Sequence, residues 1–143
     1  MKTTFLTFII ILFAANDCSN QDAESINSIT YETFTRGSTT LYTITPEKIH
    51  LKSTGLNASE NANSITNKDW KMLLEKLEDV DVSRINQLKA PSDSRASDAA
   101  PHAILSIRKN DTIYKTNSFD HGNAPETIKP LVEAILRLAE NVE

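Results

Sequence analysis

Two histidines and two aspartates in the second half of the chain are the residues whose types could support chemistry. They are Asp98, His102, Asp120 and His121. Imidazole and carboxylate groups bind zinc, and they also transfer protons during hydrolysis. A third interpretation is structural, because aspartate side chains commonly fix turns and loops by hydrogen bonds. The remaining histidine, His50, alternates in phase with two lysines, so we expect it on the solvent side of a strand and without a role.

Each of the two chemical interpretations lacks a component. The spacing of the four residues matches no known metal-ligand motif, so we expect no metal and no cofactor. A hydrolase would need a nucleophile, but no serine lies in a Gly-x-Ser-x-Gly turn, and the single cysteine, Cys18, lies near the N-terminus. We therefore favour the hydrogen-bonded interpretation and expect no enzyme activity. A metal-dependent hydrolase stays an alternative function.

A predicted hairpin would bring these residues to one place. Its strands, 103–108 and 112–117, flank a turn centred on Asn110-Asp111, so that the numbers of paired residues sum to 221. His102 would then lie opposite Phe119, and residues two apart on a strand share a face. The polar loop 88–98 would reach the same end of the hairpin, and long loops of this kind are often functional. The candidate binding residues are therefore Arg95, Asp98, His102, Phe119, Asp120 and His121.

The strands that must position this corner follow from alternating β-branched and aromatic residues. Stretches 28–35, 39–45 and 48–52 predict three antiparallel strands joined by short turns. The stretch 55–63 is polar and is expected to form a loop. The late hairpin adds two more strands.

Two amphipathic helices complete the pattern. Thr66 can cap the first with Asp69 in a variant capping box, and apolar residues then recur at helical spacing as far as Val80. The second should start at about Thr127 or Ile128. The order βββαββα predicts an α+β fold, with a single antiparallel sheet of about five strands and two helices packed on one face.

The N-terminus has the features of an export signal. A positive start precedes an apolar run at residues 5–15, which is shorter than the roughly 20 residues that cross a bilayer. Cys18 follows, and the pattern looks like a bacterial lipoprotein signal in which this cysteine is lipidated. We expect a signal peptide over 1–17, a polar tether over 18–27 and one domain over 28–143. The protein would be exported and anchored in the cell envelope through Cys18; plain secretion is the alternative.

Composition excludes several function classes. Among 143 residues there are only three glycines and one cysteine. These are too few for a glycine-rich phosphate loop, a disulfide framework or a thiolate zinc site. The formal net charge is −4, which argues against a nucleic-acid partner, because such binding depends on lysine and arginine.

One stretch carries a family resemblance. Asn117-Ser118-Phe119-Asp120-His121-Gly122, together with Leu88-Lys89-Ala90-Pro91-Ser92 upstream, resembles a family of small exported bacterial proteins. Many members of that family look like lipoproteins, and the family has no assigned biochemical function. The resemblance implies a location in the cell envelope and leaves the ligand open.

A more distant similarity is to emfourin-type inhibitors of thermolysin-like metallopeptidases. It rests on the order of the elements and on the start of the last helix, at Pro125, Ile128, Pro130, Leu131 and Val132. This similarity implies a protein inhibitor of a metallopeptidase as an alternative function. Our first expectation is a non-enzymatic binding domain whose partners are the membrane, through Cys18, and another protein.

Overall fold

A computed structural model describes residues 26–142 of the chain. The predicted signal peptide, Cys18 and most of the predicted tether lie outside the described residues, so the structure does not bear on them. None of the described helices is both long and apolar enough to cross a membrane.

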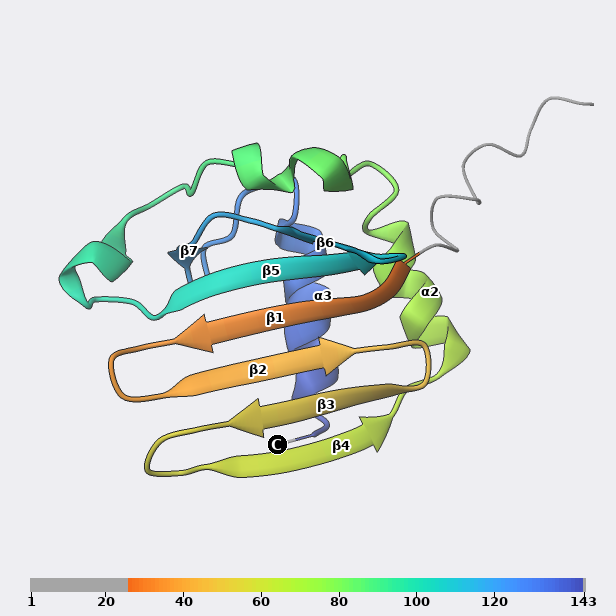
Figure 1. The fold of residues 1–143 in the computed structure, drawn as a ribbon, viewed down its shortest axis with the longest axis horizontal. Coiled ribbons are helices and arrows are strands. Elements are labelled where there is room, and N and C mark those ends of the chain that lie inside the picture. Colours follow the sequence, from red (N-terminus) through yellow and green to blue (C-terminus); the bar gives the residue numbers. More distant parts are fainter. Residues whose placement is uncertain (1–25, 143) are drawn as a thin grey trace, which may run out of the picture.

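One antiparallel sheet forms the centre of the molecule (Figure 1). Its strands are β1 (Ile26–Phe34), β2 (Thr39–Ile44), β3 (Lys48–Ser53), β4 (Ser59–Ser64), β5 (His102–Lys109), β6 (Thr112–Lys115) and the short β7 (Phe119–Asp120). The spatial order is β4-β3-β2-β1-β5-β6, and β7 pairs with the far end of β5. The first strand therefore lies in the middle, between β2 and β5, and begins two residues before the expected domain boundary.

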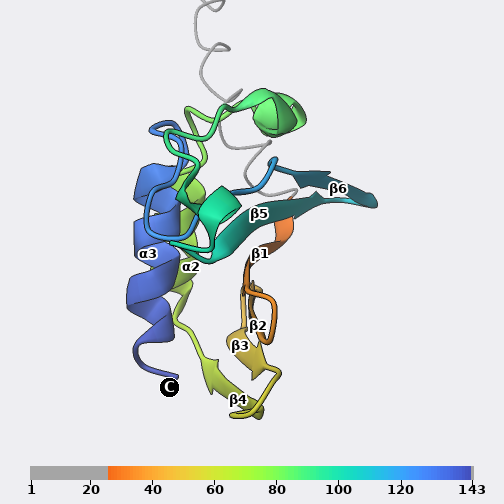
Figure 2. The same ribbon diagram turned by 90° about the vertical axis from the view of Figure 1, so that its left-hand side faces the viewer.

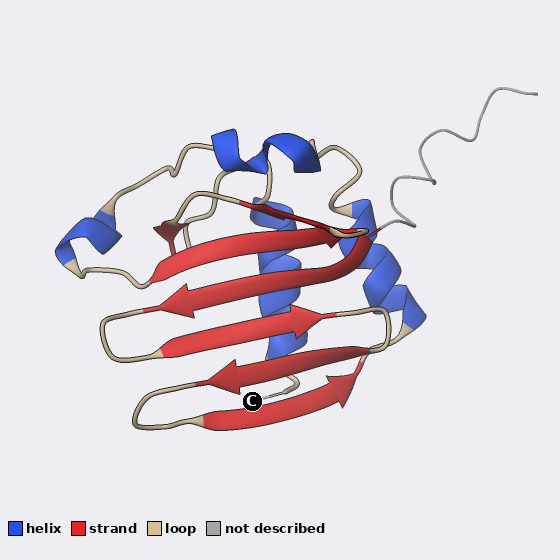
Figure 3. Ribbon diagram, in the orientation of Figure 1, coloured by secondary structure: helices blue, strands red, loops and turns tan. Residues whose placement is uncertain are grey.

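The two α-helices within residues 26–142 lie on the same side of the sheet (Figures 2 and 3). They are α2 (Asn67–Glu75) and α3 (Lys129–Ala139). Two short 3-10 helices, η1 (Val82–Gln87) and η2 (Ser94–Ser97), lie on the connection between α2 and β5. The predicted α+β class and antiparallel sheet are confirmed. No helix of the described residues lies on the opposite side of the sheet (Figure 2).

The described residues form seven strands where about five were expected, because β4 occupies most of the predicted polar loop and the short β7 follows the late hairpin. The residues of β4, Ser59 to Ser64, are all exposed and include no apolar residue larger than alanine. Sequence pattern reveals a strand through alternating burial, and β4 buries neither face. It forms by pairing in continuous register with β3, from Lys48↔Ser64 to Ser53↔Ser59.

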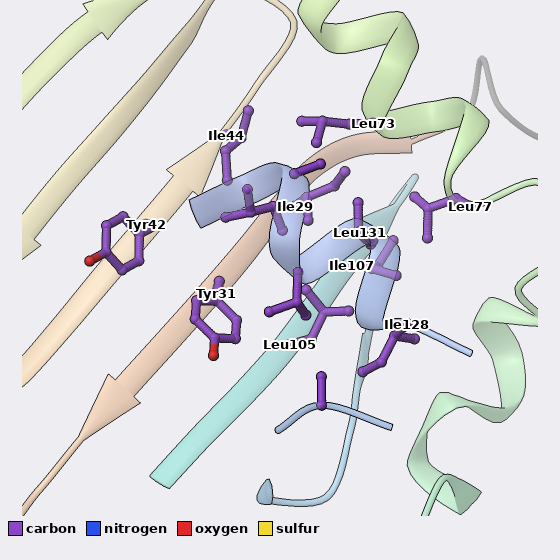
Figure 4. Close-up of a cluster of buried hydrophobic side chains, with 14 of the residues drawn as sticks. Ile29, Tyr31, Tyr42, Ile44, Leu73, Leu77, Leu105, Ile107, Ile128 and Leu131 are labelled. Atoms are coloured by element: carbon purple, nitrogen blue, oxygen red, sulfur yellow. The ribbon is translucent and has the colours of Figure 1, made fainter. Parts of the chain in front are cut away.

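The core lies between the sheet and the helices (Figure 4). Alternate residues of the strands enter it, and the helices close it from the other side. The largest fully buried side chains are Tyr31, Phe119, Ile29, Ile44, Ile49, Leu73, Ile85, Leu105, Ile107, Ile128, Leu131 and Ile135. At about 25 cal/mol per Å² of apolar surface, this burial is the main source of stability.

Both helices begin where the sequence indicates. The Thr66 hydroxyl accepts a hydrogen bond from the Asp69 N–H, and the Asp69 carboxylate accepts one from the Thr66 N–H, so the predicted capping box is confirmed. A turn at Pro125 precedes α3, where the Ile128 and Lys129 N–H groups both donate to the Pro125 carbonyl. Pro130 then lies in the first turn, where its missing N–H costs nothing.

Candidate functional site

The most heavily bonded polar group of the predicted corner is the carboxylate of Asp120, whose side chain is only 3% exposed. One oxygen accepts from the Ser92 hydroxyl at 2.5 Å and from the Ser94 N–H at 2.8 Å. The other accepts from the Arg95 N–H and from the Arg95 guanidinium, both at 3.0 Å. We call these four residues the Asp120 clamp. It fastens the loop before β5 to β7.

The clamp is surrounded by further hydrogen bonds, from the same loop and from the segment after β7. The Arg95 guanidinium also donates to the Ser92 carbonyl and pairs with Asp93, while the Asn123 amide donates to the Ser92 hydroxyl. Backbone donors at Ser94 and Arg95 are available to Asp120 because η2 begins there, and the first N–H groups of a helix lack partners within it. The buried carboxylate therefore replaces the water that the loop would otherwise need.

These donors hold the pKa of Asp120 far below its usual range, with the Ser92 hydroxyl as the largest cause. Burial acts in the opposite direction and is outweighed. A general acid or base works best with a pKa near the operating pH. Asp120 is thus an anchor for the loop that stays charged near neutral pH and is poorly matched to proton transfer there.

His121 faces a partner that the sequence did not indicate. Its Nδ1 lies 2.9 Å from the hydroxyl of Tyr31, a core residue of β1, and the two ring centroids are 5.9 Å apart. Burial lowers the pKa of His121 and raises that of Tyr31, so both groups are neutral at pH 7.

His102 lies apart from this cluster because the register differs from the predicted one. The numbers of paired residues sum to 221 at Lys109↔Thr112, as predicted. Where β7 pairs with β5 they sum to 222, because His102 lies opposite Asp120 and Ala103 opposite Phe119. One extra residue before β7 causes the shift, and such a slip exchanges the two faces of a strand. The prediction that His102 lies opposite Phe119 was therefore wrong.

The His102 ring instead stacks on Phe34 of β1, with centroids 4.8 Å apart and planes 11° from parallel. Its Nδ1 lies 3.0 Å from the Ser118 hydroxyl. Phe119 is 1% exposed and belongs to the core. Asp98 is exposed and pairs with Arg36 at 2.9 Å.

Of the six candidate residues, Arg95 and Asp120 are thus in direct contact. The other four each have a different partner or environment, as described above. The residues missed were Ser92, Ser94 and Tyr31. No sequence signal links Tyr31 to a histidine 90 residues away. The serines lie in the loop that the sequence singled out, but their bonds are long-range.

No described helix covers the face of the sheet opposite α2 and α3 (Figure 2). We call it the open face; it consists of the strand residues that alternate with the buried ones. At its centre, half-buried Phe34, Leu41 and Ile104 surround Glu32, which pairs across the strands with the last two. Basic residues flank this centre: Lys48, Lys52, Arg108 and Lys115.

One cavity of about 360 Å³ lies away from the predicted corner, between the end of α2, η1 and the β5–β6 hairpin. Its lining is mainly apolar and includes Ile26, Leu77, Val80 and Tyr114. The Asp81 carboxylate at its rim already accepts from the Ser83 N–H and hydroxyl at the start of η1. The cavity contains none of the six candidate residues.

In residues 26–142, no three His, Cys, Asp or Glu side chains gather closely enough to hold a metal ion. Comparison of the chain with protein family models, with curated proteins and with solved structures found no match. Both family resemblances therefore stay predictions. The apolar residues that suggested an emfourin-like helix, Ile128, Leu131 and Val132, are buried in the core, so packing alone accounts for them.

Proposed function

We propose that this chain is an exported, non-enzymatic binding domain of the cell envelope, held at the membrane through Cys18. Its partner would be another protein, which it meets with the open face. One observation carries the proposal. The corner richest in titratable residues uses them to hold the fold together, whereas no helix of residues 26–142 covers the opposite face of the sheet (Figure 2).

The centre of the open face suits a protein partner. Phe34, Leu41 and Ile104 come from three adjacent strands and are half-buried, so they place apolar surface around Glu32. Aromatic residues are enriched in protein interfaces, and a polar rim commonly surrounds the apolar centre. The flanking lysines and arginine provide such a rim.

The charge of the open face indicates the kind of partner. Its four lysines and arginines outnumber its two glutamates, Glu32 and Glu60, which gives a formal charge of +2. The whole chain carries −4. This difference favours a partner with acidic groups at the contact, because complementary charges accelerate association and exclude competitors.

Native complexes extracted from the producing cells test the proposal. In mild detergent, the full-length protein should migrate in a complex whose mass exceeds that of two copies. Ile104→Glu or Lys52→Glu should release it, because each places a negative charge on the open face. The matched control, Lys71→Glu, makes the same charge change on exposed residue 71 of α2 and should leave the complex intact. Equal loss in all three variants would reject the open face as the binding surface.

The alternative of a peptidase inhibitor, which rests on the emfourin resemblance, predicts a different result. An inhibitor in molar excess should slow proteolysis by thermolysin, whereas a binding domain of the kind proposed leaves the rate unchanged. The alternative of a metal-dependent hydrolase predicts zinc that stays bound through dialysis, and elemental analysis would detect it.

A further inference from the structure

The two edge strands of the sheet differ in how far other described elements cover them. The edge strand β6 has four residues, and η1 lies against it, tied by a hydrogen bond from the Asn117 amide to the Asn86 carbonyl at 2.7 Å. The other edge strand, β4, has six residues, all exposed. It forms the outermost strand of the sheet in Figure 1.

Proteins usually protect a free edge with lysine, proline, a bulge or a covering loop, because unpaired backbone groups recruit other strands. β4 contains no lysine and no proline, and its register with β3 is unbroken. Its single charge, Glu60, is held on its own sheet by His50 at 2.9 Å. The edge is therefore hydrophilic but ready to pair.

The register determines which backbone groups of β4 face outward. The Ile65 N–H donates to the Glu47 carbonyl, and hydrogen-bonded pairs alternate along an antiparallel ladder. Asn63, Asn61 and Ser59 therefore direct their backbone groups to β3. The N–H and carbonyl groups of Glu60, Ala62 and Ser64 point away from the sheet.

We propose that a second copy of this chain pairs with β4 through these groups, in an antiparallel register centred on Ala62. Ala62 then faces Ala62 of the second copy, and Glu60 faces Ser64. All three outward residues of each copy take part, which gives about six backbone hydrogen bonds. The small side chains at the centre let the strands approach without a clash.

Charge selects this register over the neighbouring symmetric ones. A register centred on Glu60 would place two glutamates directly opposite each other, which destabilises a strand pair. A register centred on Ser64 would need residues of α2 to act as strand. In the Ala62 register each Glu60 lies opposite Ser64 of the other copy. Lys48 of that copy is the β3 residue paired with this Ser64, so it is the next residue across the sheet.

An edge-to-edge contact of this size buries less than the roughly 1,200 Å² typical of stable complexes. The dimer should therefore be weak, with a Kd on the order of 0.1–1 mM. The pairing joins the open faces of two copies into one surface. It requires no other protein, which separates it from the proposed binding function.

Sedimentation equilibrium of the purified protein tests the proposal, at an ionic strength of about 0.15 M to screen the net negative charge. The average molar mass should rise toward that of a dimer as the concentration approaches about 1 mM. Ala62→Pro should stay monomeric, because it removes an outward N–H that β3 does not use. Ala62→Ser keeps that N–H and should behave like the native protein.

A disulfide trap tests the register in a Cys18→Ser background. Opposed residues of a hydrogen-bonded pair have Cα atoms about 5.5 Å apart, within the range of a disulfide. Ala62→Cys should therefore form a covalent dimer under mild oxidation. Ser64→Cys lies on the same face but about 14 Å from its copy in this register, so it should not. A native protein that stays monomeric at 1 mM, or equal trapping at both positions, would overturn the proposal.

Discussion

The Asp120 clamp and the open face contain similar residue types, yet they use them in opposite ways. In the clamp, a buried carboxylate accepts four hydrogen bonds from three residues. On the open face, Glu32 and the flanking lysines lie on a surface that no described helix covers. The difference teaches that gathered polar residues can be entirely occupied with folding, while a dispersed set on one sheet face stays exposed, which is why we propose that face for recognition.

Burial explains why the two regions differ. A buried charge is tolerated only when its hydrogen bonds are satisfied, so the clamp can serve no second purpose without losing stability. Across residues 26–142, no buried side-chain nitrogen or oxygen lacks a partner. The exposed charges of the open face are solvated in both the folded and the unfolded protein, so they contribute little to the free energy of unfolding. Substitutions should therefore separate the two regions clearly.

Asp120→Asn should have the largest effect. The new amide directs hydrogens at donors that already point to this position, so several bonds are lost at once. We expect Tm to fall by about 10 °C, together with faster hydrogen exchange in residues 92–98. Asp98→Asn removes an exposed ion pair and should leave Tm nearly unchanged. Similar values for the two variants would contradict the clamp.

Acid titration should give the next largest effect. Since the pKa of Asp120 is lowered on folding, its contribution is complete above its ordinary pKa of 3.8 and decreases as the pH falls below that value. Urea unfolding between pH 5 and pH 2 should show this loss in the native protein. The corresponding slope should be shallower in Asp120→Asn. If the free energy of unfolding fell equally with pH in the two proteins, another carboxylate would account for the loss of stability in acid.

Tyr31→Phe should have an intermediate effect. It removes the hydroxyl that connects the core to His121, at a cost of about 1–2 kcal/mol in the free energy of unfolding. The pKa of His121, lowered by burial, should also change, and NMR titration of the ring would measure it. A variant with native stability would show that water replaces the hydroxyl.

Lys52→Glu should have the smallest effect on the free energy of unfolding, within about 0.5 kcal/mol of the native value. Lys52 is exposed, and its nearest carboxylate, Glu60, is 3.9 Å away. Chemical denaturation would measure the change. A large loss of stability would place the open face among the structural regions and remove the contrast with the clamp.

Much of the fold was predictable from the sequence because local rules determine it. Alternating apolar residues located most of β1–β3, and the Thr66 capping box located the start of α2. β4 was missed because a strand exposed on both faces has no periodic signal. The corner was anticipated only in part, since Arg95 and Asp120 do meet there. One extra residue before β7 moved Phe119 away from the face of His102, and no local rule predicts that insertion.

Site-specific photo-crosslinking in the producing cells tests the central claim most directly. A photoreactive amino acid would replace Leu41 on the open face in one variant and exposed Ser97 beside the clamp in another. We predict a single discrete adduct with another protein from residue 41 and none from residue 97. An adduct from residue 97, with residue 41 unreactive, would contradict the account and assign recognition to the clamp.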